Sequence, residues 1–196
     1  MSVRPDPRLE LSLSPGLTLS DASRQFFDVF PGGPPATYGQ RYVFAGLDRS
    51  EIYARIRVGY GITPDLTLEL YGEPFASTVR YHDFGELTGA GERTLRLYGT
   101  DGTSVEELED GSRVVTDGAD QFTLFNSDFR LRSFRSNAVL KWEWRRGSTL
   151  HLIWQQNRWY WEDRNDPLDA GSLFRSLSDA GEHVLVAKVS YWFSIR

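Results

Sequence analysis

The chain has 196 residues, a formal net charge of −5 and no cysteine, and its isoelectric point is near 5.3. Without cysteine there are no disulfides or thiolate metal sites, and the acidic balance gives no reason to expect nucleic-acid binding. No apolar run approaches the roughly 20 residues that a membrane helix needs, although barrels hide their apolar residues in alternation.

The N-terminal quarter predicts strands interrupted by turn-forming residues. Apolar and polar residues alternate over residues 8–14, and Pro15-Gly16 then favours a bend within one long strand over a tight turn. The Pro-Gly-Gly-Pro-Pro cluster predicts a loop over residues 21–39. Residues 40–47 alternate again, and Asp48-Arg49-Ser50 is predicted to be a short connection.

The strongest strand signal lies in residues 50–80. Ile52, Ile56 and Val58 fall on one face of a period-two pattern, and a turn is predicted at Thr63-Pro64-Asp65. Each arm exceeds the usual strand length of about 5–6 residues and reaches the roughly 9–11 residues with which a tilted strand crosses a bilayer.

Two segments predict long polar loops, at 81–133 and 162–181. The first is rich in Gly, Asp, Glu and Thr, and short hairpins are expected around Asp110-Gly111 and Asp117-Gly118, without a second hydrophobic core. The second carries Asn165-Asp166-Pro167, and Leu173-Phe174 favours a short helical turn.

The C-terminal third predicts three further strands. Residues 136–145 and 149–161 alternate on either side of a turn at Arg146-Gly147-Ser148, and residues 183–193 close the chain. About seven strands result, whereas single-chain bacterial barrels have an even number.

These patterns predict an all-β fold, an antiparallel meander of long strands in a single domain over residues 1–196. The long strands favour a transmembrane outer-membrane β-barrel, or its C-terminal part, over a soluble β-sandwich. If the C-terminus is periplasmic, every short turn lies on the periplasmic side and the loops at 81–133 and 162–181 are extracellular, with 21–39 as the exception. The start MSVRPDPRLELSLS lacks the pattern of a signal peptide, so a C-terminal fragment of a larger exported barrel is expected.

Two sets of residues are candidates for function. Charges in mid-strand predict a lumen network of Arg55, Arg57, Glu69, Glu73, Lys141, Glu143, Arg145 and Lys188. Aromatic residues near strand ends predict an interfacial girdle or a sugar-stacking surface of Trp142, Trp144, Trp154, Trp159, Tyr160, Trp161, Tyr191, Trp192 and Phe193.

Metal and catalytic chemistry have weaker signals. His82, His151 and His183 are far apart and lack ligand spacing, so no metal site and no cofactor are predicted. Glu69 with Glu73 or Glu143 has the residue types of a glycosidase carboxylate pair, but carboxylates among arginines are more often ion pairs. We therefore expect no enzyme, and an envelope glycoside hydrolase stays a third hypothesis.

Three segments carry a family resemblance: TPDLTLELYGEPF (63–75), SNAVLKWEWRRGSTLHLIWQQNR (136–158) and VAKVSYWF (186–193). They resemble the C-terminal β-barrel of the domain of unknown function 5916 family. These are large exported bacterial proteins that often carry an N-terminal module like carbohydrate-binding family 9. The resemblance implies an outer-membrane barrel and no catalytic residues. The chain departs from barrels that end on an aromatic residue, because Ser194-Ile195-Arg196 follow Phe193.

The function expected from these patterns is anchoring, or passage or binding of a ligand, at the bacterial surface. The expected partners are outer-membrane lipid, the barrel assembly machinery and a carbohydrate ligand. The alternative is a soluble β-sandwich that binds carbohydrate through its tryptophans.

Overall fold

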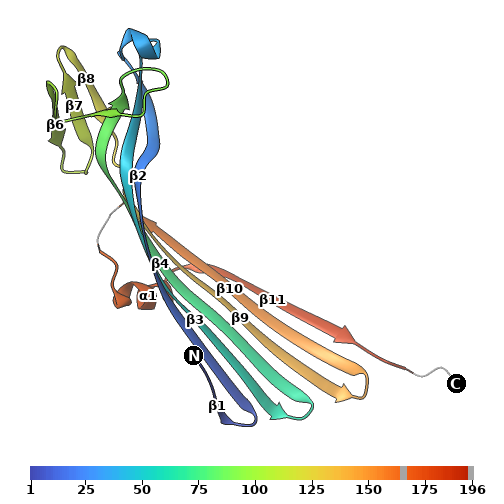
Figure 1. Ribbon diagram of the computed structural model, residues 1–196. Coiled ribbons are helices and arrows are strands. Elements are labelled where there is room, and N and C mark those ends of the chain that lie inside the picture. The colour runs from blue at the N-terminus through green and yellow to red at the C-terminus, as the bar shows by residue number, and fades with distance from the viewer. Residues whose placement is uncertain (164–166, 194–196) are drawn as a thin grey trace.

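The computed structural model describes residues 1–163 and 167–193 of an all-β protein (Figure 1). Its main sheet is an antiparallel meander in the order β1-β2-β3-β4-β9-β10-β11, with β5 paired to β4, and β6-β7-β8 form a separate sheet. The elements are β1 (Ser2–Asp6), β2 (Leu9–Pro31), η1 (Pro35–Thr37), β3 (Gln40–Thr63), β4 (Leu66–Leu87), β5 (Leu95–Leu97), β6 (Thr103–Glu107), β7 (Arg113–Asp117), β8 (Asp120–Leu124), β9 (Phe129–Arg145), β10 (Ser148–Glu162), α1 (Ala170–Ser176) and β11 (Gly181–Ser190).

The main sheet is open. Within the described ranges its outer strands are β1 and β11, and these two strands do not pair with each other. The expectation of an antiparallel all-β meander is confirmed, whereas closure into a barrel is not seen. No helix among the described residues is long and apolar enough to cross a membrane.

Three predictions about β2 and β3 have different outcomes. The prediction of one long strand through Pro15-Gly16 is confirmed, because β2 runs through both residues. A Cβ on Gly16 would lie 2.2 Å from the ring of Tyr53, so a larger residue there would displace that ring. The loop predicted at 21–39 is wrong, since β2 continues to Pro31 and pairs with β3, which leaves residues 32–39 as the connection. Asp48-Arg49-Ser50 is likewise no connection but the middle of β3, paired on both sides.

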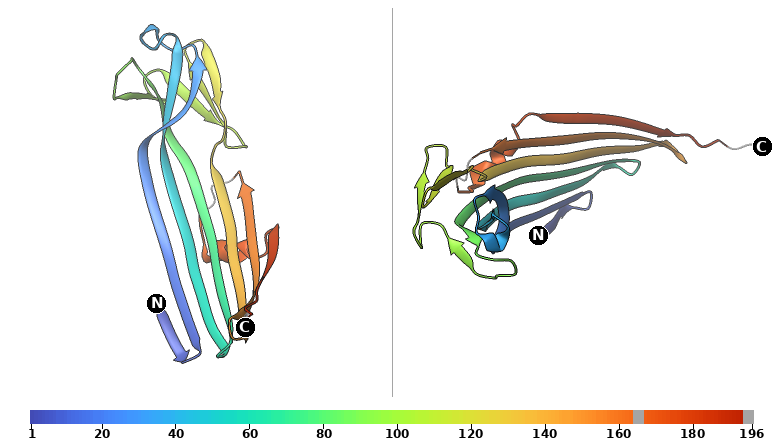
Figure 2. Two further views of the ribbon diagram at one scale, coloured as in Figure 1. Left: turned by 90° about the vertical axis from the view of Figure 1, so that its right-hand side faces the viewer. Right: turned by 90° about the horizontal axis from the view of Figure 1, so that it is seen from above.

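These corrections remove the exception in the predicted topology. The short connections 7–8, 64–65 and 146–147 lie at one end of the sheet, and the long ones, 32–39, 88–128 and the described residues 163 and 167–180, lie at the other (Figure 2). The predicted turns at Thr63-Pro64-Asp65 and Arg146-Gly147-Ser148 are confirmed, and part of the last long connection, including Asn165 and Asp166, lies outside the described residues.

The long polar loop predicted at 81–133 is shorter than expected, and its predicted hairpins are present. Strand β4 continues to Leu87, β9 begins at Phe129, and strands β5 to β8 lie between them, with the hairpin turns near Asp110-Gly111 and Asp117-Gly118 as expected. Phe84, Val115 and Leu124 of this region pack with Val43 and Ala45 of β3 in a hydrophobic core that the sequence did not predict. We call residues 24–47 and 83–128 the head.

Below the head, the remaining strands spread into a wide sheet (Figure 1). Helix α1 covers the upper end of this sheet, where Arg130 of β9 donates a hydrogen bond of 2.7 Å to Ser172. The helix confirms the turn predicted at Leu173-Phe174, and Asp169 caps its first turn by accepting a hydrogen bond of 2.7 Å from the backbone of Ser172.

Candidate functional site: the two faces of the wide sheet

One face of the wide sheet is apolar across six strands. Because residues paired across a ladder share a face, the register aligns a full row of apolar side chains. One such row runs from β2 to β11 through Leu11, Val58, Leu70, Ala138, Trp154 and Leu185. We call this surface the apolar face. The next row towards the short connections is Leu9, Tyr60, Leu68, Leu140, Leu152 and Ala187.

The apolar face is exposed. Leu17 is 66% exposed at one side of the sheet and Leu185 is 75% exposed at the other. Large exposed hydrophobic side chains on this face are Leu13, Leu17, Leu19, Ile56, Tyr60, Leu70, Trp142, Leu152, Trp154, Leu185 and Val189. Soluble monomers rarely expose contiguous apolar patches above a few hundred Å². The face is therefore incomplete without something to cover it.

The opposite face, the polar face, carries the charges in mid-strand. Its hollow has a volume of about 770 Å³ and is lined by Glu10, Arg57, Glu69, Tyr71 and Asn137, among others. A neighbouring hollow of about 400 Å³ lies over β9 and β10. The two hollows share Tyr71 and Asn137 in their linings, and together they leave room for water or a hydrophilic ligand.

The lumen charge network predicted from the sequence is formed only in part. Arg55 donates a hydrogen bond of 2.6 Å to Glu73, which also accepts one of 2.7 Å from the hydroxyl of Tyr71. The Arg57 guanidinium lies 5.5 Å from the centre of the Tyr71 ring, and Glu69 lines the hollow beside it.

The remaining members of the predicted network do not join it. Lys141 and Lys188 lie on either side of His151 on the polar face. Glu143 and Arg145 lie at the turn instead, where Glu143 accepts a hydrogen bond of 3.0 Å from the backbone of Gly147 and Arg145 donates one of 3.1 Å to Tyr191. Sequence alternation alone could not place them, because a register shift at Ser148 interrupts the pairing of β9 with β10.

The predicted aromatic residues gather at two levels. Near the short connections, Trp142 and Trp144 pack edge to face with ring centres 6.2 Å apart. Tyr191 and Phe193 stack at 6.2 Å, and the backbone of Trp192 donates to Ser148.

The second aromatic level lies near the long connections. Trp161 stacks on Phe129 with ring centres 4.1 Å apart, and Arg132 lies over the ring of Tyr160 at 4.6 Å. Trp159 is exposed beside them, whereas Trp154 lies between the levels and stacks on His183 at 5.8 Å.

The head is stabilised by a buried ion cluster that sequence reasoning missed. Arg41, 3% exposed, donates to Glu86 at 3.0 Å and to Asp117 at 2.8 Å, and Arg96 donates to Asp117 at 2.8 Å. The hydrogen bond from Arg96, supported by Arg41 against the effect of burial, lowers the pKa of Asp117 to about 2. Burial beside Glu86 raises the pKa of Tyr98 well above its usual range. The cluster joins β3, β4 and β5 to β7, so its role is to hold the head together.

Comparisons with known proteins give no family. No protein-family model matches the chain, and neither the search of curated proteins nor the search of solved structures finds a match.

Proposed function

We propose that the wide sheet is a section of the wall of a bacterial outer-membrane β-barrel. In this proposal the apolar face contacts lipid, the polar face lines the lumen, and the long connections with the head are extracellular. The observation that carries it is the exposed apolar face, where the row from Leu11 to Leu185 and the row from Leu9 to Ala187 cross six strands without a charged side chain. The charged residues Arg55, Arg57, Glu69 and Glu73 lie on the other face.

The upper boundary of the apolar region is slanted across the sheet, and this slant supports contact with a membrane. On β2 the aliphatic residues extend up to Leu19, which is level with Glu162, whereas on β11 they end at Leu185, which is level with Trp154. From each strand to the next, the upper boundary of the apolar region thus shifts along the strand direction by about 1.6 residues, or about 5 Å. Neighbouring strands are about 4.8 Å apart. A horizontal bilayer boundary would give this shift if the strands were tilted by roughly 45°, near the range of outer-membrane barrels.

The length of the apolar region on β2 agrees with a bilayer. Ten residue steps separate Leu9 from Leu19, and the residues of the apolar face between them are all apolar. At about 3.3 Å per residue and a tilt of roughly 45°, these steps rise about 23 Å, close to the apolar band of about 25 Å in outer-membrane barrels.

The open edges must be paired for such a wall to be stable in lipid, because unpaired backbone groups are costly there. Strand β11 is exposed along its whole length, and β1 covers only a short part of β2. We propose that further strands pair with both edges and close the barrel.

The role that this wall serves best is to anchor the head at the bacterial surface and to pass or bind a hydrophilic extracellular ligand in the polar hollow. Carbohydrate is the ligand class that we propose, because exposed aromatic rings such as Trp159 and Trp161 near the long connections can stack on sugar rings. The barrel assembly machinery would insert the protein.

The first test is refolding of the urea-solubilised full chain in detergent micelles, lipid vesicles or plain buffer, followed by circular dichroism and heat-modifiable gel migration. A β spectrum with a gel shift that depends on detergent or lipid is expected. A monomeric, cooperatively folded β protein in buffer would overturn the proposal and favour the soluble carbohydrate-binding module.

A second test uses the absence of cysteine, since any single introduced cysteine is a unique label site. Ile56→Cys and Arg57→Cys are adjacent but lie on opposite faces. In vesicles, a water-soluble thiol reagent is expected to label the cysteine at position 57 at least tenfold faster than the one at position 56. Equal rates in the refolded protein would contradict a lipid-facing apolar face.

A further inference from the structure

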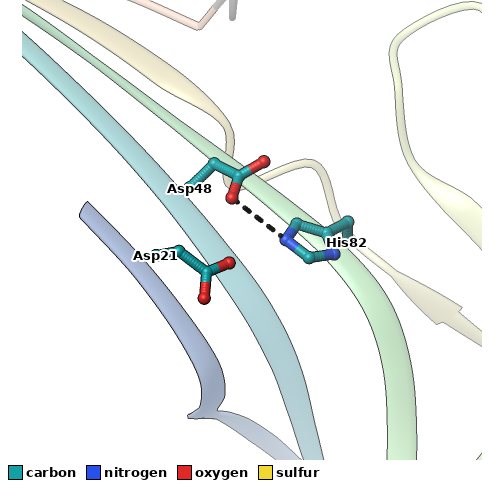
Figure 3. Close-up of side chains that lie close together, drawn as sticks. All are labelled: Asp21, Asp48 and His82. Carbon is teal, nitrogen blue, oxygen red and sulfur yellow. Dashed lines mark ion pairs between the residues drawn. The ribbon is translucent and has the colours of Figure 1, made fainter. Parts of the chain in front are cut away.

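A second cluster of side chains lies where the head meets the wide sheet. Asp21 of β2, Asp48 of β3 and His82 of β4 point towards one another (Figure 3), and their candidate ligand atoms all lie within 4.8 Å of one another. The row of Asp21 and Asp48 is above the row of Leu19 and Glu162, so the cluster lies above both aromatic levels. It belongs neither to the polar hollow nor to the buried ion cluster.

The backbone brings the histidine to the carboxylates. His82 pairs with Gly46, and a Cβ at position 46 would lie 2.4 Å from the imidazole ring. Glycine at this position therefore lets the ring lie across β3 towards Asp48. The ladder is also irregular between Phe44 and Gly46, and Asp83 has a positive φ of 48°. Such irregularities re-aim side chains at functional sites.

One ring nitrogen is oriented and the other is left without a hydrogen bond. Nδ1 of His82 lies 2.9 Å from a carboxylate oxygen of Asp83, which fixes the orientation of the ring. Nε2 is buried without a hydrogen-bond partner in the described structure, and it lies 3.4 Å from Asp48. A carboxylate that orients one nitrogen, with the second nitrogen facing another possible ligand, is the arrangement of metal-binding histidines.

The two aspartates lie directly opposite each other on neighbouring strands, where like charges repel. Among the described residues, His82 is the only ion-pair partner within 4 Å of Asp48, and Asp21 has none. Arg80, which pairs with Asp48 in the ladder, forms no ion pair with it within the described ranges. A cation between the carboxylates would remove this repulsion.

We propose that Asp21, Asp48 and His82 bind a divalent transition-metal ion, with Zn²⁺ as the best match. One imidazole nitrogen and two carboxylate oxygens are ligand types that Zn²⁺ accepts at about 2.0–2.2 Å. Ligand atoms around a tetrahedral ion lie roughly 3.4 Å apart, so the carboxylates need only rotate to close on it. The imidazole disfavours Ca²⁺ and Mg²⁺, which prefer oxygen ligands. The ion would join β2, β3 and β4 below the head, independently of what covers the apolar face.

The test is Zn²⁺ binding to the full chain without an affinity tag, in whichever medium supports its β structure. Isothermal titration and competition with a chromogenic chelator are expected to give one Zn²⁺ per chain. Asp21→Asn and His82→Gln should each weaken binding at least tenfold, whereas the matched controls Glu106→Gln and His151→Gln should leave it unchanged.

Gly46→Ala provides a test that removes no ligand atom. The added Cβ should displace the His82 ring and weaken Zn²⁺ binding, while Gly59→Ala, which meets no atom closer than 4.0 Å, should not. If Gly46→Ala does not fold, Asp83→Asn tests the same point, because loss of the supporting carboxylate should weaken binding by about 10- to 100-fold. Absence of stoichiometric binding would overturn the proposal and leave an ion pair only. So would wild-type affinity in both the Asp21→Asn and the His82→Gln variants.

Discussion

The head and the wide sheet contain the same three strands, β2, β3 and β4, but only the head encloses a core. In the head, β7 and β8 cover the strands, and Val43 and Leu124 are 0% and 1% exposed. In the wide sheet, α1 covers only the upper end of β4, β9 and β10, and the row from Leu11 to Leu185 has no such cover among the described residues. The head therefore encloses its own core, whereas the wide sheet depends on its surroundings.

The largest expected effect is on the buried ion cluster of the head. Glu86→Gln should lower the free energy of unfolding by about 3–5 kcal/mol, because it leaves the buried Arg41 charge with fewer partners. Chemical denaturation of the refolded chain measures it. Arg41→Met combined with Glu86→Gln should recover part of the loss, and a wild-type midpoint in the single variant would show that the cluster does not support the head.

A cavity in the head core is the next test. Leu124→Ala should cost about 2–5 kcal/mol, because it removes fully buried contacts. Leu185→Ala on the apolar face is the matched control and should cost much less, because that side chain is 75% exposed. Equal losses in denaturant titrations would remove the distinction between the two regions.

A charge on the apolar face tests its contact with lipid. Leu68→Arg should cost about 2–4 kcal/mol near the bilayer midplane. Gln155→Arg is the control, since Gln155 faces the polar hollow. Folded fractions in vesicles over a denaturant series compare the two variants, and an unchanged fraction for Leu68→Arg would argue against lipid on this face.

The pH dependence of the head is expected to be smaller. The folded pKa of Asp117 is about 2 against about 3.8 unfolded, so its contribution is present above about pH 4 and is lost as the pH falls through about 2. About 1–2 kcal/mol should disappear in this window once solvent screening is allowed for. Denaturation at several pH values measures the loss, and Asp117→Asn should flatten the curve; a wild-type slope in that variant would contradict the assignment.

The smallest expected effect is on the polar face. Arg57→Glu places a negative charge diagonally between Glu69 and Glu73, so it should lower the denaturation midpoint slightly at low salt. The shift should vanish at high salt, because these side chains are partly solvated. Equal midpoints at low salt would show that Arg57 does not face the two carboxylates.

The all-β class, the long strands and the division into two faces were predictable from the residues alone, because a period of two needs no tertiary information. The hairpin turns at Thr63-Pro64-Asp65 and Arg146-Gly147-Ser148 were predictable for the same reason, since turn chemistry is local.

The extent of the strands, the core of the head and the side-chain clusters depend on the tertiary structure. It showed that β2 and β3 run on into the head, because their Pro, Gly and Asp residues are held in place by pairing with neighbouring strands. It joined Val115 and Leu124 to Val43 in one core, and it brought Arg41 to Glu86 and His82 to Asp21 and Asp48. These residues are far apart in the chain, and strand register and bulges, which follow from packing rather than from local pattern, determine which of them meet.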